Sequence, residues 1–465
     1  MTRRLYSLLI YCVVPFAFAL VLWRGLRDRG YRQALGERFG WGRRLDSPCI
    51  WLHAVSLGEM SAAATLVRAL RAAHPDLPLV LTTATPTGRA RAMGLFGDAA
   101  DVRFLPYDTP GAVARFLHRI RPRCAIIMET ELWPNLFHAC ERRGVPLVLA
   151  SARLSATSVA RYRRFGRLMR GIFCANVTIA AQAPVDAERF VAIGAARSQV
   201  HVVGNIKFDV DVGAGVIERG RALRARWGSA RPTWAAGSTH AGEEEAVLDA
   251  HAALLAQRPD ALLLLAPRHP ARFEAVALLL RRRGLSFTRR SAAQESGAAG
   301  LLSQVVLVDT VGELAALYAA ADAAFVGGSL VPIGGHNLLE PAALGLPVLT
   351  GPSQANGRDI ARLLFAQGAA VQVADAHELA EAVVRLFGDP EERGRIGVAG
   401  RQLVAANRGS VARLIALIEP SLQGPVPPLR GPALTQDSAP LQGPAPPQSP
   451  AASQDSAPDR PSAER

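Results

Sequence analysis

Residues 51–60 read WLHAVSLGEM, and this stretch contains the unit from which the fold is built. An apolar run stops at Ser56-Leu57-Gly58, a carboxylate follows at Glu59, and residues 60–73 (MSAAATLVRALRAA) have a helical composition. An apolar strand that turns directly into a helix is typical of parallel α/β sheets. Because a glycine lets another backbone or a ligand approach closely, Gly58 and Glu59 mark a candidate ligand edge.

The same order of strand, turn and helix recurs in two runs along the chain. Candidate strands are 50–56, 79–83, 102–105, 125–129 and 147–151 in the first run and, after a break near 210–215, 233–237, 262–267, 305–308, 324–327 and 347–350 in the second. Two runs predict two doubly wound parallel-sheet domains, which suit 465 residues better than a single core. Ligands bind beyond the carboxyl ends of such strands, so two facing sheets are expected to form a cleft.

A candidate membrane anchor precedes the first run. Leu5 to Trp23 carries no charge and is flanked by arginines on both sides. At ~1.5 Å per residue it spans about 28 Å, close to the ~30 Å hydrocarbon core of a bilayer. A cleavable signal peptide is the alternative, but no small-residue cleavage site closes the run. We expect an uncleaved anchor with the body on the cytoplasmic side, where more positive charge lies. Pro15 leaves open whether the segment spans the bilayer or lies in one leaflet.

Composition narrows the class of partner. The formal net charge is +14, and Lys207 is the only lysine. This balance suits an anionic membrane face or anionic substrates. No basic-aromatic strand pattern, zinc-finger spacing or recognition-helix signature supports nucleic acid. The five cysteines form no C-x-x-C pair and the ten histidines are scattered, so we predict no disulfide framework and no metal site. The stretch 424–465 holds 11 of the 32 prolines and is expected to be disordered.

Acidic side chains follow two of the predicted strands. Glu59 follows the first strand, where its simplest role is to satisfy the positive end of a helix dipole. Glu129 and Glu131 follow another strand in IIMETELWPN, residues 126–135. Capping is again the simple interpretation, but two carboxylates beside Trp133 at the ligand edge of a sheet also fit a chemical role. At this stage both interpretations stay open.

Lys207 lies in VVGNIKFDVD, just before the break between the two runs. Arginine occupies all the remaining Lys/Arg positions of this chain. A lone lysine therefore suggests a need for its compact ammonium, although chance survival is the alternative. The next residues, Asp209-Val210-Asp211, spell D-x-D, which holds a divalent ion in metal-dependent sugar transferases. Here the pair falls in a linker, and we expect it to be solvated.

The second run carries polar groups at three strand ends. LLLLAPRHP places Pro267 and Arg268 at a strand end, where the guanidinium can pair with a phosphate. DTVGELAALY places Val311-Gly312-Glu313 at a helix start. In FVGGSLVPIGGHNLLEPAALGLPVLTGP, residues 325–352, a glycine-rich loop precedes a helix predicted to open at residues 337–340. Backbone N–H groups at such a helix start form an anion site, and Glu340 can hold ribose hydroxyls. A tightly packed glycine turn without a ligand is the alternative.

Together these motifs resemble a known family. Glu59 in HAVSLGE, followed in order by ETELWPN, GNIKFD, APRHP, GELAALY and GGHNLLEPAA, resembles the 3-deoxy-D-manno-octulosonic acid (Kdo) transferases of lipopolysaccharide biosynthesis. The resemblance runs from the anchor to about residue 420. It implies a GT-B fold, CMP-Kdo as donor, a lipid A precursor as acceptor, cytoplasmic-membrane lipids as partners, and neither cofactor nor metal. The implied location is the cytoplasmic face of the inner membrane.

The resemblance also assigns roles to individual residues. Glu59 matches the general base, and Glu129 and Lys207 match positions that stabilise the transition state. The implied CMP contacts are Pro267, Arg268, Val311, Gly312, Glu313, Asn337, Leu338, Leu339 and Glu340. The expected domains are an anchor (1–30), an acceptor-binding α/β domain (31–212), a CMP-sugar-binding α/β domain (213–423) and the proline-rich tail (424–465).

These assignments predict a direct displacement. An ionised Glu59 accepts the proton of the attacking hydroxyl, while Arg268 and the helix start near Asn337 take the charge of the departing CMP without a metal. The anomeric carbon is then expected to invert. A UDP-sugar transferase or epimerase of the same fold is one alternative, since the glycine loop and Glu340 would serve it equally. A catalytically silent membrane scaffold is another. Protection by CMP but not by UDP distinguishes the three.

Overall fold

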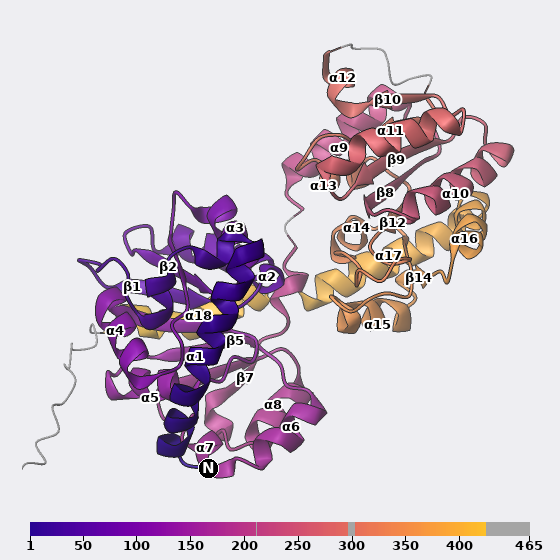
Figure 1. Ribbon diagram of the computed structural model, residues 1–465. Helices are drawn as coiled ribbons and strands as arrows, with labels where there is room; N and C mark the ends of the chain where they lie inside the picture. Colours follow the sequence, from indigo (N-terminus) through magenta and orange to yellow (C-terminus); the bar gives the residue numbers. More distant parts are fainter. Residues whose placement is uncertain (211, 296–302, 425–465) are drawn as a thin grey trace, which may run out of the picture. The chain divides into compact units, whose positions relative to one another are not determined.

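The computed structural model describes residues 1–424, apart from 211 and 296–302. Two parallel seven-stranded sheets organise this part of the chain (Figure 1). The first has the strand order β3-β2-β1-β4-β5-β6-β7 and the second β10-β11-β9-β8-β12-β13-β14. In each sheet, the strands that come next in the sequence lie on one side of the initial strand (β1 or β8), and the later strands lie on its other side. Both predicted doubly wound sheets are therefore confirmed.

The elements of the first sheet alternate as expected. Its strands are β1 (Cys49–His53), β2 (Leu79–Thr83), β3 (Asp101–Phe104), β4 (Pro122–Met128), β5 (Leu147–Ala152), β6 (Val177–Ala181) and β7 (Val200–Val202). Its helices are α2 (Leu57–Ala73), α3 (Pro86–Phe96), α4 (Pro110–Ile120), α5 (Pro134–Arg142), α6 (Ala156–Arg163), α7 (Gly166–Arg170) and α8 (Pro184–Ala192), with short 3-10 turns η1 (Arg29–Arg32), η2 (Leu35–Phe39), η3 (Arg197–Gln199) and η4 (Ile206–Phe208).

The second sheet repeats the arrangement. Its strands are β8 (Thr233–Thr239), β9 (Leu262–Pro267), β10 (Phe287–Arg289), β11 (Val305–Leu307), β12 (Ala323–Val326), β13 (Val348–Thr350) and β14 (Ala370–Gln372). Its helices are α9 (Ala214–Trp227), α10 (Glu243–Gln257), α11 (Phe273–Arg282), α12 (Arg290–Glu295), α13 (Leu314–Ala319), α14 (Leu339–Leu344), α15 (Arg358–Ala366), α16 (Ala376–Gly388) and α17 (Pro390–Asn407), with η5 (Pro270–Arg272) after β9.

Apolar side chains from the helices bury both faces of each sheet. On the first sheet α4, α5, α7 and α8 contribute to one core and α2 and α3 to the other. On the second sheet α9, α13, α14 and α15 contribute to one core and α10, α11 and α16 to the other. Strands such as β1 and β9 are buried at every position, as expected where helices cover both faces.

The last helix departs from this division. In α18 (Ser410–Gln423) the apolar residues Val411, Leu414, Ile418 and Leu422 belong to the core of the first sheet, beside α2 and β4 (Figure 1). His74 at the end of α2 and Glu419 of α18 form an ion pair at 3.0 Å. The segment expected to end the second domain thus also completes the first core. The domain limits themselves stay a prediction, and the tail from residue 425 onward lies outside the described residues.

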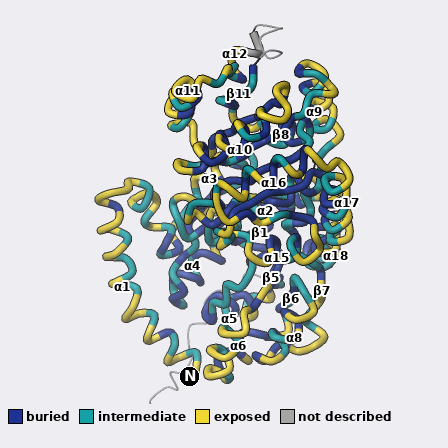
Figure 2. The backbone as a smooth tube through the Cα atoms, turned by 90° about the vertical axis from the view of Figure 1, so that its right-hand side faces the viewer, coloured by how far each residue is buried: buried dark blue, intermediate teal, exposed yellow. Residues whose placement is uncertain are grey.

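Helix α1 (Arg3–Arg27) is long and apolar enough to cross a membrane, and most of its side chains are exposed or half-exposed (Figure 2). It nevertheless contacts the first sheet's helices near both of its ends. The Tyr6 hydroxyl donates to Asp108 Oδ2 (3.0 Å) and the Ser7 hydroxyl to Asn135 Oδ1 (2.8 Å). Towards the other end, the rings of Phe18 and Phe39 meet edge to face with centroids 5.1 Å apart.

Candidate active site

Glu59 lies in the first turn of α2, directly beyond the end of β1. Ser56 caps the helix by accepting from the Glu59 backbone N–H (3.3 Å), and Glu59 Oε2 accepts from the Val55 N–H (2.8 Å). The side chain therefore has the helix-start role considered above. A Cβ added at Gly58 would find no atom nearer than Ser56 Oγ at 3.8 Å, so the protein's own packing does not require glycine there.

The electrostatics of Glu59 go beyond capping. Its pKa is raised from the ordinary 4.5 to about 7, chiefly by burial and with a smaller contribution from the charges of Glu129 and Glu131, against the Val55 hydrogen bond and the Lys207 ammonium. Capping alone would be expected to lower the pKa of a helix-start carboxyl. The four charged groups that follow β1, β4 and β7 thus act on one another, which fits the open edge where the chain reverses its building direction.

The backbone at Glu129 is itself unusual. Its φ is +54°, in the left-handed region that non-glycine residues occupy at a cost of about 1 kcal/mol or more. Its N–H still donates to Ala150 O on β5 at 2.9 Å, so the sheet holds this conformation in place. Glu131 follows in the same turn, and burial raises its pKa. Such strain at a strand end is a common feature of functional turns.

Lys207 joins this group from the turn η4. Asn205 caps the turn by accepting from the Lys207 N–H at 3.0 Å, and Lys207 Nζ lies 3.8 Å from Glu129 Oε1. Both side chains are about one-quarter to one-third exposed. A cavity of about 140 Å³ lies beside them, lined also by Arg153, Asn205 and residues 355–360. The lone lysine is therefore neither solvated on all sides nor part of a core.

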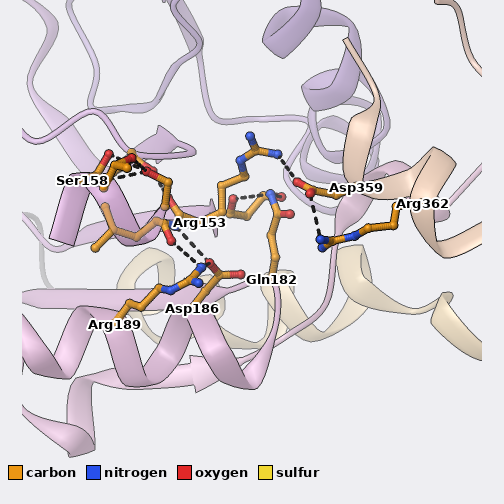
Figure 3. A network of polar contacts seen from close by, with 12 residues as sticks. Arg153, Ser158, Gln182, Asp186, Arg189, Asp359 and Arg362 are labelled. Carbon is orange, nitrogen blue, oxygen red and sulfur yellow. Dashed lines mark hydrogen bonds and ion pairs between the residues drawn. The ribbon is translucent and has the colours of Figure 1, made fainter. Parts of the chain in front are cut away.

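Arg153 and Asp359 form a second charged contact at this cavity. Arg153 Nη1, just after β5, donates to Asp359 Oδ2 at 2.8 Å, and Arg362 Nη2 lies 3.7 Å from the other carboxylate oxygen (Figure 3). Asp359 is in the first turn of α15. Two residues of α8 hold the loop after β5 in place. The Leu154 N–H donates to Asp186 at 3.0 Å, and Arg189 donates to Leu154 O at 2.8 Å.

The residues matched to CMP contacts follow neighbouring strands of the second sheet. Pro267 ends β9, Val311-Gly312-Glu313 follow β11, and Asn337 to Glu340 follow β12. In the order β11-β9-β8-β12 these strands are parallel, so their carboxyl ends lie at one edge. Residues far apart in the sequence, such as Pro267 and Glu340, therefore follow strands whose carboxyl ends share this edge, and their contact with a nucleotide stays a prediction.

The contacts of these residues differ. The Arg268 side chain is exposed and has neither hydrogen bond nor ion pair within the described ranges, so its guanidinium is free for a ligand. Glu313 is held by Arg290 (3.0 Å) and Thr310. Asn337 Nδ2 donates to Glu340 Oε1 at 3.0 Å, and Asn337 Oδ1 accepts from the Leu339 N–H at 3.1 Å. The helix predicted to open at Asn337 thus begins two residues later, at Leu339, with Asn337 before it.

Asp209, the first residue of the D-x-D pair, is not solvated on all sides as expected. The two oxygens of Asp209 accept from the Gly409 and Val411 backbone N–H groups, at 2.6 and 2.5 Å, so Asp209 holds the start of α18. Asp211 lies outside the described residues. Asp209 is therefore already engaged by two backbone donors at this helix start.

Sequence reasoning missed three polar residues at these edges. Arg153 and Asn205 line the cavity at Lys207, and Glu243 holds the second sheet's edge. Glu243 is fully buried at the start of α10, and its two oxygens accept from the backbone N–H groups of His240, Gly328, Ser329 and Leu330 at 2.7–3.0 Å. The acidic run AGEEE after a strand could have signalled Glu243, but no local pattern signals Arg153.

Two family models match the chain. Residues 33–210 match the model described as 3-deoxy-D-manno-octulosonic-acid transferase (kdotransferase), and residues 236–403 match glycosyl transferases group 1. The structure of a UDP-GlcNAc 2-epimerase from Neisseria meningitidis bound to UDP-GlcNAc is similar over 80% of this chain and all of that chain, with a TM-score of 0.52 and 13% identity. At that identity the likeness concerns the fold alone, which is the two-sheet GT-B arrangement.

Curated relatives match over almost their whole length. The 3-deoxy-D-manno-octulosonic acid transferase of Haemophilus influenzae is 40% identical over 427 residues, which cover 91% of this chain and 99% of the relative. The transferase of the same name from Bordetella pertussis is 40% identical over 433 residues, covering 90% of this chain and 99% of the relative. With the two sheets and their charged edges in place, this identity shows that the chain belongs to the 3-deoxy-D-manno-octulosonic acid transferase family.

Proposed function

We propose that this protein transfers Kdo from CMP-Kdo to a lipid A precursor, with inversion at the anomeric carbon. The observation that carries the proposal is Glu59, a carboxyl at the reversal point of the first sheet whose pKa burial raises to about 7. A general base is most effective when its pKa lies near the working pH. A carboxyl with an ordinary pKa would be a much weaker base for a sugar hydroxyl.

In this proposal the reaction is a single displacement. The acceptor hydroxyl oxygen forms a bond to the anomeric carbon of Kdo while its proton passes to the ionised Glu59 carboxylate. The bond between the anomeric carbon and the phosphate oxygen breaks, and its electron pair leaves with CMP. Because the nucleophile and the leaving group occupy opposite sides of the carbon, the product has the inverted configuration. Gly58, which has open space at its Cα, leaves room for the acceptor beside the base.

The charge on CMP grows as it departs, so cationic groups near the phosphate lower the barrier. The exposed Arg268 is the proposed contact, since a guanidinium matches a phosphate geometrically. Lys207 is proposed to neutralise the donor's carboxylate or phosphate. Its 3.8 Å approach to Glu129 supports the role of Glu129 as a positioning partner for the ammonium. The ion pair with Glu129, whose own backbone is strained, holds the Lys207 ammonium at a defined place.

Metal independence is part of the proposal. Asp209 is engaged at the start of α18, and the cations proposed for the phosphate are side chains of this chain. EDTA should therefore leave turnover within about twofold of the untreated value. Loss of turnover on chelation that magnesium restores would contradict this part of the mechanism.

The main experiment supplies both proposed substrates to the protein and identifies the product. The purified full chain is incubated with CMP-Kdo and a tetraacyl lipid A precursor, and the product is weighed by mass spectrometry. We expect addition of Kdo, together with a higher melting temperature in CMP and no change in UDP. Protection by UDP alone would favour a UDP-sugar enzyme, and an inert chain that nevertheless binds the glycolipid would favour a scaffold.

We further propose that α1 anchors the protein to the cytoplasmic face of the inner membrane. The exposed apolar side chains of α1 include Leu8, Phe16 and Leu26, at 62%, 78% and 71% exposure, which is costly in water. Replacing these three with serine should move the protein from the membrane fraction to the soluble fraction. Serine at three exposed apolar positions of the second half, Leu278, Ile333 and Val398, is the matched control and should not.

A further inference from the structure

The second sheet reverses its building direction between β8 and β12, and each of these strands is followed by a histidine-bearing loop. His240 comes directly after β8, and His336 ends the glycine-rich loop after β12. In open α/β sheets ligands bind at this reversal point. None of the roles assigned so far to individual residues uses either imidazole.

The two imidazoles form a close pair. Their Nε2 atoms lie 2.8 Å apart, and the rings are parallel to within 7°. A hydrogen bond of this length between two ring nitrogens requires that one donate a proton and the other accept it. In the neutral pair the accepting ring therefore carries its own proton on Nδ1, from which it can donate outward. Each added proton gives the pair one more outward donor.

The surrounding backbone holds this pair in place. The buried Glu243 carboxylate binds the N–H groups of His240 and of Gly328, and so ties the two loops together. Gly328 has a φ of +70°, and a Cβ there would lie 2.8 Å from His336 Cδ2. Only glycine leaves the space that His336 fills. The residue before His240, Thr239, is also fully buried, and its hydroxyl has no hydrogen-bond partner within the described ranges.

Basic side chains surround the pair. His269 packs edge to face against His240 with ring centroids 5.4 Å apart, and the charges of Arg268 and His269 act on both imidazoles. Arg272 and Glu243 act on His240 in opposite senses. Burial, followed by the neighbouring basic groups, lowers the pKa of His336 to about 4, and burial also lowers the pKa of His240. Of the charged groups that act on the pair, Arg268, Arg272 and His269 would favour an anion placed here, and the Glu243 carboxylate would oppose it.

We propose that the His240–His336 pair binds the phosphate of the nucleotide donor, donating a hydrogen bond to a phosphate oxygen. The inference rests on the proposed CMP-Kdo function and adds two residues that touch the donor. Arg268, already assigned to CMP, acts electrostatically on both rings and so places the phosphate in their neighbourhood.

The pair also suits a leaving phosphate better than a fixed cation alone. When the bond to the sugar breaks, the phosphate gains one negative charge. Once the pair has taken up a proton, that proton can move to the ring facing the phosphate, which then becomes the stronger donor as the charge grows. Because burial disfavours the protonated pair in the free protein, binding a phosphate should raise its pKa and draw in a proton.

The test compares two ligands that differ only in the phosphate. The full chain in detergent is titrated with CMP and with cytidine by calorimetry, alongside His240→Gln and His336→Gln. A lost hydrogen bond to a charged group corresponds to roughly a 10- to 100-fold weaker CMP affinity. We expect this loss for CMP only, with cytidine affinity changed less than about twofold. His377→Gln, at an exposed imidazole on α16, is the matched control and should bind both ligands as the parent does.

A second measurement uses the unchanged protein and so does not depend on how the variants fold. CMP binding is measured between pH 7 and 8, where the CMP phosphate is a dianion, in buffers of different ionisation enthalpy. Proton uptake and tighter binding at the lower pH would support the pair. Equal losses for CMP and cytidine in both variants, or CMP binding without proton uptake, would overturn the inference. A parent protein that binds no CMP would instead overturn the proposed function.

Discussion

The two sheets place different chemistry at the same topological position. Where the first sheet reverses, β1 and β4 are followed by Glu59 and Glu129; where the second reverses, β8 and β12 are followed by the loops of His240 and His336. Each edge also has a carboxylate at a helix start, but their surroundings differ. Glu59 accepts one backbone N–H, whereas Glu243 accepts four.

The number of backbone donors explains the difference in role. Burial raises the pKa of Glu59 because one hydrogen bond cannot replace the lost water. Glu243 fills its lone pairs with N–H groups and so serves to join two loops. A carboxylate at a ligand edge can thus be a base or a structural tie, and the count of its backbone donors distinguishes the two. The predictions below test this distinction, beginning with the largest effect.

Replacing Glu59 with glutamine should lower turnover by roughly 10²- to 10⁴-fold with donor affinity little changed, because the base is lost and the shape kept. The stability should not fall. Since the folded-state pKa of Glu59 lies above its unfolded value, its ionisation costs stability, and this cost grows as the pH rises from about 4.5 to about 7. At pH 8 the variant should melt no lower than the parent. Near-normal turnover would leave Glu59 as a helix-start acid only.

Lys207→Arg conserves the charge but widens the cationic group beside Glu129. A misplacement of about 1 Å can cost on the order of 100-fold in rate, so we expect a loss of that size in turnover. The melting temperature should stay within about two degrees, because the side chain is partly exposed and its pairing contributes little. Arg153→Lys makes the reverse exchange at another residue that lines the same cavity. Equal activity of Lys207→Arg and the parent would remove Lys207 from the site.

The pH profile of kcat/KM should reveal Glu59 directly. A base must be ionised, so activity should fall about tenfold per pH unit below its pKa of about 7. The residual activity of Glu59→Gln should not show this fall. A profile that stays flat down to pH 5.5 in the parent would mean that no group with a raised pKa limits the reaction.

Glu243→Gln is the counterpart of Glu59→Gln on the second sheet, and its effect should appear in stability. The new amide NH₂ would face backbone N–H groups that now donate to the carboxylate, at a cost of about 1–3 kcal/mol. We expect the melting temperature to fall by several degrees, with CMP affinity falling because both histidine loops loosen. A stable Glu243→Gln protein with unchanged CMP affinity would contradict the role of Glu243 in joining the two loops.

The central strands could be predicted because they follow from local sequence, and so could the polar residues that follow them, whose roles stay predictions. Buried strands such as β1 and β9 are continuous apolar runs, and a polar residue after each run marks the ligand edge. The outer strands β6, β7, β10 and β14 were not predicted. β7, β10 and β14 have only three residues each and none of them is fully buried, so they lack an apolar run long enough to recognise. β6 is longer, but three of its five residues are threonine or alanine.

Contacts distant in sequence could not be predicted at all. His240 and His336 meet only because β8 and β12 are neighbours, which no pattern around either histidine indicates. Asp209 meets the start of α18 across about 200 residues, so a residue expected to be solvated instead holds the start of a helix. By contrast, Glu59 was predicted as both helix-start acid and base, and its surroundings accommodate both.

The contacts of α1 bear on its orientation in a bilayer. Ser7, Phe18 and Gly25 fall on one face of the helix at about 100° per residue, and this face meets the folded body. Phe16 lies on the opposite face, and Leu8 and Leu26 lie together on one flank. A helix that crossed the membrane would carry Tyr6 to the opposite surface, away from Asp108. With these contacts intact, we expect the proposed anchor to lie parallel to the membrane plane, and spin labels at Leu8 and Leu26 should then report the same depth in one leaflet.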